Sequence, residues 1–201
     1  MKKFTSRDLL SSLITGLTTG IIAWRILEYL DVYQFGFSSA WLVLITPLLW
    51  IVGVNLGYYL GRHIDFFTRF GRFAAIGFTN AAVDFGALYG FIAIFGEARG
   101  LTFSLYKAVA FGIAVIHSYF WNKYWTFDAG QSPTSSKQFV SFVAVALVSL
   151  LVNVGIATLV YESAVATGSD PKIWAGISAV AGSAAALVFS YLGFKILVFK
   201  K

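Results

Sequence analysis

Two polar residues interrupt an apolar stretch and could form a binding pocket inside a membrane. Asn80 and Asp84 are four residues apart, so a helix would place both side chains on one face. Asp84 would lie about 18 Å from Arg72 at a helical rise of about 1.5 Å per residue, more than halfway across a hydrocarbon core roughly 30 Å thick. A carboxylate at that depth costs about 2.5–3.5 kcal/mol, so it needs a partner or a purpose. Two interpretations follow: a pocket that accepts sugar hydroxyls or a proton, and a structural hydrogen bond between helices, such as one from Asp84 to Asn153.

Three basic residues lie where the predicted helices would meet the membrane surface. Arg72 precedes one apolar run, and Lys123 and Lys195 follow two others. Cationic donors at a common depth could hold a lipid phosphate through short charge-assisted hydrogen bonds, but the same residues suit ordinary basic flanks. Lys123 also stands between Asn122 and Trp125. An interfacial aromatic belt accounts for Trp125, whereas the Asn-Lys pair is not expected from a belt alone.

Two further ionisable residues, Lys107 and His117, lie on one predicted helix, at about residues 102–121. His117 would lie at nearly the depth of Asn80 on the neighbouring helix, where it could carry a proton or simply form a hydrogen bond. Lys107 opens the helix on the opposite side of the membrane. It could neutralise a departing phosphate or anchor the helix at the interface.

Only membrane helices can position these residues. Of 201 residues, 58% are hydrophobic and 12% are charged, and the mean hydropathy is +0.77, whereas soluble domains carry about 25% charged residues. Open strands cannot cross lipid, because their backbone groups would lack partners. The sequence therefore predicts an all-α, polytopic membrane protein with six transmembrane helices, at about residues 9–30, 40–60, 73–95, 102–121, 139–160 and 173–198.

The basic residues predict the orientation. Most of the 15 Lys and Arg residues fall on one side of this topology, and Arg99, Lys107 and Lys172 fall on the other. Because Lys and Arg gather on the cytoplasmic side, we expect both termini in the cytoplasm and the chain in the cytoplasmic (inner) membrane. The net charge of +6 then reflects topology, and no nucleic-acid partner is expected.

The composition also argues against an enzyme. The sequence has no Cys and two His, too few for a metal-ligand cluster, and it has no nucleophile elbow, P-loop or dinucleotide-binding pattern. No soluble stretch is long enough for a catalytic domain. We expect no catalytic residue, no metal and no cofactor.

The last four predicted helices contain an internal repeat. Residues 72–87 align with residues 141–156 at an offset of 69, and residues 118–127 align with residues 190–199 at an offset of 72. This alignment places Asn153 opposite Asp84. Each copy is a two-helix hairpin, so spans three and four share their orientation with spans five and six. Such a parallel repeat is related by an axis along the membrane normal.

The first two helices stand outside the repeat. We predict an extra N-terminal hairpin at residues 1–62 and a four-helix domain at residues 69–201, with repeats at about 72–127 and 141–199. Arg25 and Glu28, three residues apart, should form a local ion pair. Small residues predict close helix packing within one chain, with a dimer face as the alternative; they are Gly16, Gly20, Gly53, Gly57, Gly61, Gly86 and Gly90.

Two motifs in this order resemble the GtrA family. They are RFxxxGxxNxxxD, from Arg72 to Asp84, and N-K-x-W-x-F, from Asn122 to Phe127. The resemblance covers about residues 69–201, and the second repeat has Phe194 in place of Asn122. The N-terminal hairpin departs from the usual four-span pattern of that family. The resemblance implies movement of polyprenyl-phosphate-linked monosaccharides from the cytoplasmic to the outer leaflet, for glycosylation of cell-surface polysaccharides.

This implied function gives the candidate residues roles. Flipping needs cations at the entry face, hydrogen-bonding groups near the midplane, and a lateral opening for the lipid tail. Lipid-phosphate binding would fall to Arg72, Asn122, Lys123 and Lys195. The polar midplane site would comprise Asn80, Asp84, His117, Trp125 and Asn153, with Lys107 at the outer release point.

Two other functions are compatible with the sequence. A non-transport membrane partner could dock or orient a glycosyltransferase through the glycine-lined first helices, and it would co-purify with that enzyme without flipping lipid. A small-solute exporter could couple transport to protons through Asp84, and it would respond to a proton gradient. The partners to consider are therefore the sugar lipid, the membrane, a membrane glycosyltransferase and a second copy of the chain.

Overall fold

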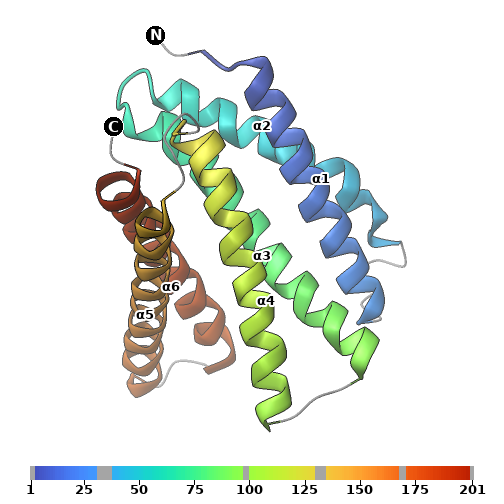
Figure 1. Ribbon diagram of the computed structural model, residues 1–201. Helices are drawn as coiled ribbons and strands as arrows, with labels where there is room; N and C mark the ends of the chain where they lie inside the picture. The colour runs from blue at the N-terminus through green and yellow to red at the C-terminus, as the bar shows by residue number, and fades with distance from the viewer. Residues whose placement is uncertain (1–2, 31–37, 97–99, 130–134, 168–170, 200–201) are drawn as a thin grey trace. The chain divides into compact units, whose positions relative to one another are not determined.

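The computed structural model is all-α in the part of the chain it describes, which confirms the predicted class (Figure 1). It describes residues 3–30, 38–96, 100–129, 135–167 and 171–199. The α3 helix begins at Phe66 rather than at residue 73, so Arg72 is helical. The helices are α1 (Ser6–Tyr29), α2 (Leu42–Leu60), α3 (Phe66–Phe95), α4 (Gly100–Trp121), α5 (Ser136–Ala166) and α6 (Pro171–Gly193).

Two of these helices end in a π-helical turn. The turn η2 (Asn122–Thr126) follows α4, and η3 (Phe194–Val198) follows α6. A 3₁₀ turn, η1 (Ser39–Trp41), precedes α2. The Phe127 amide donates to the Asn122 carbonyl at 2.9 Å, and the Phe199 amide donates to the Phe194 carbonyl at 2.8 Å. Single π-helical turns are rare and often occur at functional sites.

Apolar helix surfaces identify a multi-pass membrane protein. Among the described residues, four helical segments are long and apolar enough to cross a bilayer: Ser6–Tyr29, Ser39–Leu60, Phe66–Phe95 and Ser136–Asn153. Large apolar side chains on them are exposed, including Leu44 at 72% and Leu151 at 70%. Such surfaces suit lipid contact rather than water. Crossing by α4 and α6 as well stays a prediction.

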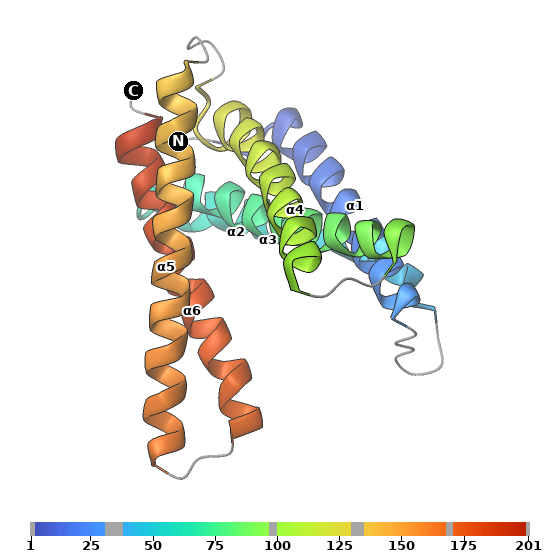
Figure 2. The ribbon, with the colours of Figure 1, turned by 60° about the horizontal axis from the view of Figure 1, so that its bottom comes forward.

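The chain divides into two compact units, residues 1–128 and 129–201. The first unit holds α1 to α4 and η2, so the N-terminal hairpin belongs with α3 and α4. The second unit holds α5, α6 and η3. Within the second unit, α5 and α6 lie side by side as an antiparallel hairpin (Figure 1 and Figure 2).

Glycines bring the helices of the first unit together. A Cβ atom added to Gly20 would lie 2.5 Å from the Leu42 carbonyl oxygen, and one added to Gly16 would clash with the Pro47 backbone. Gly57 and Gly71 form the equivalent close approach of α2 to α3. These contacts confirm the predicted packing within one chain at Gly16, Gly20, Gly57, Gly61 and Gly86, whereas a Cβ on Gly53 or Gly90 would meet nothing within 4 Å.

Candidate functional site

A buried carboxylate at the start of α1 is the centre of a polar cluster. Asp8 has no exposed surface. Thr5 caps the helix, and its hydroxyl accepts a hydrogen bond from the Asp8 amide at 3.2 Å. The Asp8 Oδ2 atom in turn accepts from the Thr5 amide at 2.9 Å and from the Thr5 hydroxyl at 2.7 Å. This capping box satisfies helix-end amides and fixes the carboxylate in one orientation.

The same carboxylate binds residues from three other elements. The Tyr58 hydroxyl of α2 donates to Asp8 Oδ2 at 2.9 Å, and the Trp125 indole of η2 donates to Asp8 Oδ1 at 3.0 Å. Arg72 of α3 places its Nε atom 2.8 Å from Asp8 Oδ1. A buried charge requires this kind of pairing, because desolvation costs several kcal/mol per ion. Asp8 therefore joins the N-terminal hairpin to α3 and η2.

The guanidinium group of Arg72 has partners besides Asp8. One terminal nitrogen donates to the Trp125 carbonyl at 3.2 Å, and the other donates to the Tyr58 hydroxyl. Its carbon also lies 5.4 Å from the centre of the Tyr58 ring, a cation–π distance. The Arg72 side chain is 17% exposed, whereas that of Asp8 is 1% exposed. Arg72 is thus the member of this ion pair that a ligand can reach.

A second link joins α1 to the end of η2. Arg7 forms an ion pair with Asp128 at 2.9 Å and donates to the Tyr124 carbonyl. Both charged side chains are largely exposed, so this pair contributes little to stability. Along the same helix, Arg25 and Glu28 lie 2.5 Å apart, which confirms the predicted local pair.

The predicted phosphate-binding residues have different surroundings. Asn122 and Lys123 are 1% and 0% exposed, and the side-chain Nδ2 atom of Asn122 donates to the Ser118 carbonyl at 2.9 Å. They adjoin Trp125 in η2, so the first unit brings them together with Arg72. Lys195 belongs to the second unit, where it is exposed. A role in phosphate binding stays a prediction for all four.

Two ring contacts show which face of α3 points toward α4 and its terminal turn η2. Phe73 lies 6.4 Å from Phe127 at one end, and Phe91 lies 5.8 Å from Tyr106 at the other. Asn80 is about two helical turns after Phe73, and Asp84 is about two turns before Phe91. All four therefore lie on one stripe of α3 that faces α4.

The opposite face of α3 binds the N-terminal hairpin. Thr79 accepts hydrogen bonds from Thr19 of α1 and Trp50 of α2, each at 3.1 Å. Gly86, two turns later, approaches Ile22 of α1. One side of α3 thus anchors the hairpin while the other carries the two polar residues toward α4.

His117 lies at the matching height on α4. It follows Tyr106 by about three helical turns, which returns it to the face that contacts α3. Interpolation between the two ring contacts places it opposite the interval between Asn80 and Asp84. The Oδ1 atom of Asn80 and the Nδ1 atom of His117 are buried and have no hydrogen-bond partner within the described residues. Asp84 is half-buried. Buried polar atoms are normally hydrogen-bonded, so these two atoms are available to bind a polar ligand.

The other predicted midplane residues belong to other elements than α3 and α4. Trp125 is 2% exposed and its indole nitrogen binds Asp8, so it belongs to the carboxylate cluster. Asn153 lies on α5 in the second unit and is half-buried. The Lys107 side chain falls outside the described residues. An Asp84–Asn153 bond stays a prediction.

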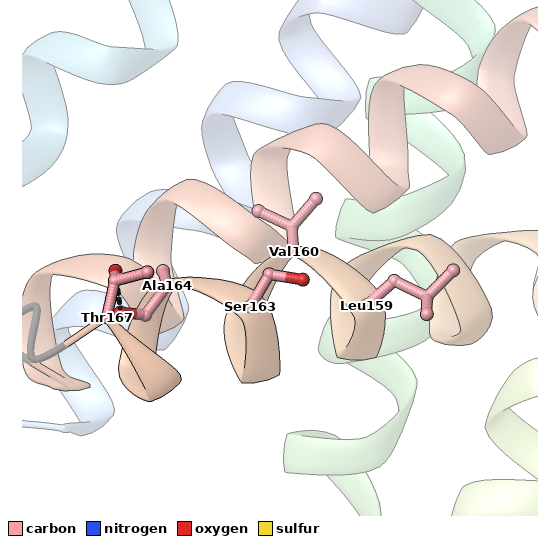
Figure 3. A pocket seen from close by; sticks show the side chains of 5 residues that line it. All are labelled: Leu159, Val160, Ser163, Ala164 and Thr167. Carbon is pink, nitrogen blue, oxygen red and sulfur yellow. Dashed lines mark hydrogen bonds between the residues drawn. The ribbon is translucent and has the colours of Figure 1, made fainter.

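A shallow hollow occurs near the end of α5 (Figure 3). It has a volume of about 420 Å³, and its labelled residues are Leu159, Val160, Ser163, Ala164 and Thr167. The Thr167 hydroxyl donates to the Ala164 carbonyl at 2.7 Å, so its donor is already used. The lining carries no ionisable group, and none of the predicted site residues contributes to it.

Asp8 and Tyr58 are site residues that the sequence motifs did not reveal. The T-x-x-D pattern from Thr5 to Asp8 is a capping-box signature and could have predicted the helix start. It does not indicate that the same carboxylate binds Arg72. Nothing around Tyr58 distinguishes it from an interfacial tyrosine.

Fold and site together define a multi-pass helical membrane protein with a polar face inside one helix pair and a buried ion pair at its end. The family model for "GtrA/DPMS, transmembrane domain" matches residues 72–200, and the chain belongs to this family. Neither the curated proteins nor the solved structures contain a match. The predicted resemblance is confirmed, and the match begins at Arg72, so α1 and α2 lie outside it.

Membership gives the chain a membrane function related to sugar-linked lipids, in a family that is in general non-catalytic. The Arg72 and Trp125 side chains lie inside the matched region. Asp8 and Tyr58, which hold them, lie before it.

Proposed function

We propose that this protein moves a polyprenyl-phosphate-linked monosaccharide from the cytoplasmic to the outer leaflet. The observation that carries this proposal is the polar face between α3 and α4, where Asn80 and His117 present buried polar atoms without partners in the described residues. Moving a sugar through hydrocarbon requires polar groups inside the membrane, because buried hydroxyl groups need hydrogen-bond partners. A structural hydrogen bond between the two helices would use these atoms, and neither atom has a partner within the described residues.

The phosphate would enter at the end of α3. Arg72 is the partly exposed cation of the buried cluster, and its planar group can bind two phosphate oxygens at once. With both termini in the cytoplasm, as the basic residues predict, this end of α3 faces the donor leaflet. Asn122 and Lys123 of η2 would add hydrogen-bonding and positive groups beside Arg72, and a contribution from Lys195 of the second unit stays a prediction.

The sugar would then meet the polar face. Asn80 Oδ1 and the Asp84 carboxylate can accept hydrogen bonds from sugar hydroxyls, and His117 can donate or accept. Each hydrogen bond within the membrane contributes about 0.6 kcal/mol on average, enough to lower a barrier without trapping the cargo. The lipid tail stays in the bilayer because it needs no polar path. Release would follow near Lys107.

Transport in reconstituted vesicles tests this function. Asn80→Ala combined with His117→Ala should lower the flipping rate of polyprenyl-phosphate sugar by about tenfold, since two hydrogen bonds at about 0.6 kcal/mol each are lost. Asn55→Ala is the matched control, because Asn55 is exposed on α2 and donates to its own helix at Ile51. A folded double variant that flips lipid at the native rate would show that this face is not the path.

The same preparation separates the alternatives. Co-purification of a glycosyltransferase without any flipping would favour a docking partner. Transport of a water-soluble substrate that responds to a proton gradient would favour an exporter.

A further inference from the structure

We propose that Asp8 is an internal counter-ion that sets the affinity of Arg72 for lipid phosphate, so that cargo binds by exchanging with the carboxylate. This inference rests on the proposed function, because it concerns the same cation. Asp8 belongs to the N-terminal hairpin, which lies outside the family match. The hairpin would thereby control an anion site that the family domain carries.

The first argument is charge. Arg72 and Asp8 lie 2.8 Å apart and neutralise each other, and Arg7 is likewise paired with Asp128. A phosphate that approaches Arg72 therefore also comes close to the Asp8 carboxylate. The negative charge of Asp8 repels the negative charge of the phosphate, and the repulsion is only partly screened because the carboxylate is buried away from water. The wild-type site should bind phosphate weakly.

The second argument is that the pair can separate. Asp8 accepts four hydrogen bonds without Arg72: two from Thr5, one from Tyr58 and one from Trp125. The Nε–H group of Arg72 lies near the carboxylate but does not form a directed hydrogen bond with it. If Arg72 turned to a phosphate, the carboxylate would keep all four bonds and stay in place.

The third argument is access. A guanidinium group carries five N–H donors. The Trp125 carbonyl and the Tyr58 hydroxyl each accept one of them, from the two terminal nitrogens. The side chain is also 17% exposed, whereas the Asp8 side chain is 1% exposed. A ligand can therefore contact Arg72 directly, whereas the buried Asp8 carboxylate acts on the ligand through its charge alone.

The test measures binding of polyprenyl monophosphate to the full chain in phosphatidylcholine nanodiscs. Asp8→Asn removes the negative charge but keeps the side-chain size, and it should tighten binding on the order of tenfold. Glu28→Gln is the matched control, because it removes the same charge from the same helix, where Glu28 pairs with Arg25. The control should bind as the wild type does. The uncharged polyprenol should bind all three proteins equally.

A gain in binding is informative because a damaged fold would cause a loss. Unchanged or weaker binding of both polyprenyl monophosphate and inorganic phosphate by a folded Asp8→Asn protein would overturn the inference. If that variant does not fold, Tyr58→Phe decides, since it removes the hydroxyl that binds both charges and keeps the ring. Tyr58→Phe should tighten binding by about threefold, and unchanged or weaker binding would again contradict the counter-ion role.

An inorganic phosphate arm separates this inference from the proposed function. If Asp8→Asn tightens binding of both inorganic phosphate and the lipid, the counter-ion role holds for phosphate in general. If it tightens binding of inorganic phosphate alone, the counter-ion role holds and a lipid cargo is contradicted. No gain for either ligand overturns the counter-ion role, and the vesicle assay still judges the transport function independently.

Discussion

The α3–α4 hairpin and the α5–α6 hairpin end in the same way but use that end differently. Each finishes in a π-helical turn, and each turn places a phenylalanine against the first helix of its own hairpin. Phe73 and Phe127 lie 6.4 Å apart, and the corresponding Phe142 and Phe199 lie 6.1 Å apart. These matching contacts support the predicted repeat.

The difference begins at the first residue of the turn. Asn122 occupies it in the first hairpin and hydrogen-bonds Ser118. Phe194 occupies it in the second and stacks on Phe142 at 4.1 Å. One hairpin thus closes with a polar side chain and the other with a ring stack.

The difference continues along the turn. Lys123 is 0% exposed, whereas the matching Lys195 is exposed. Trp125 is 2% exposed and binds Asp8, whereas the matching Leu197 is 60% exposed. Similar backbones therefore support a polar, charged interior in one copy and an apolar contact in the other. Substitutions at matched positions can break or sharpen this contrast.

The largest expected effect is on the free energy of unfolding, and it is expected at Arg72, which the alignment pairs with Ser141 in the second copy. Arg72→Gln should lower the free energy of unfolding by about 4 kcal/mol, because it leaves the fully buried Asp8 carboxylate without a cation. The matching Ser141→Ala should change it by less than about 0.5 kcal/mol. Denaturant unfolding in detergent measures both.

A double variant separates charge from packing. Asp8→Asn together with Arg72→Gln should recover most of the stability, since no buried charge is left unpaired. It should still bind polyprenyl phosphate more weakly than Asp8→Asn alone. If Arg72→Gln alone is as stable as the wild type, the Asp8–Arg72 ion pair does not stabilise the α3–α4 hairpin.

The ring stack should matter next. Phe194→Ala should cost about 3 kcal/mol, at the low end for a buried phenylalanine, because lipid tails also solvate apolar surface. Leu197→Ala on the same turn is the control and should cost little, because its side chain is already exposed. Equal losses at Phe194 and Leu197 would mean that the stack does not close the second hairpin.

A single charge on the polar face should have an intermediate effect. Asp84→Asn places in the α3–α4 hairpin the same residue type that the second copy has at the aligned position 153. It should lower the flipping rate about tenfold with little change in stability. The reciprocal Asn153→Asp should not compensate, since the two copies differ in their surroundings. A native flipping rate for Asp84→Asn would indicate that the residue only ties helices together.

The smallest effect is expected at the surface lysine. Lys195→Ala should weaken lipid binding by about threefold or less, because an exposed ammonium group gains little from a partner in water. Lys123→Ala should weaken it more, because Lys123 is buried and its charge is less screened by water and salt. A larger loss of lipid binding for Lys195→Ala than for Lys123→Ala would indicate that the second copy, rather than the first, binds the lipid phosphate.

Much of the architecture could be predicted from local patterns. Long apolar runs predicted helices close to the observed α1, α2, α4 and α6, the last including η3, and glycine spacing predicted the close approach at Gly16 and Gly20. The end of α5 was predicted at residue 160, but the helix continues to Ala166. The start of α3 was predicted too late, since basic residues lower hydropathy without ending a helix. Helical spacing also placed Asn80 and Asp84 on one stripe, and the ring contacts show that this stripe faces α4.

By itself, then, the sequence determined the membrane class, the family, the Arg25–Glu28 pair and the periodic faces of the helices. Each depends on composition or on residues within a few turns of one another. Only the tertiary structure decided that Asp8 binds Arg72, Tyr58 and Trp125, and that Lys123 is buried while Lys195 is not. Those outcomes depend on how separate helices pack, and contacts between residues 50 or 117 positions apart leave no local pattern in the chain.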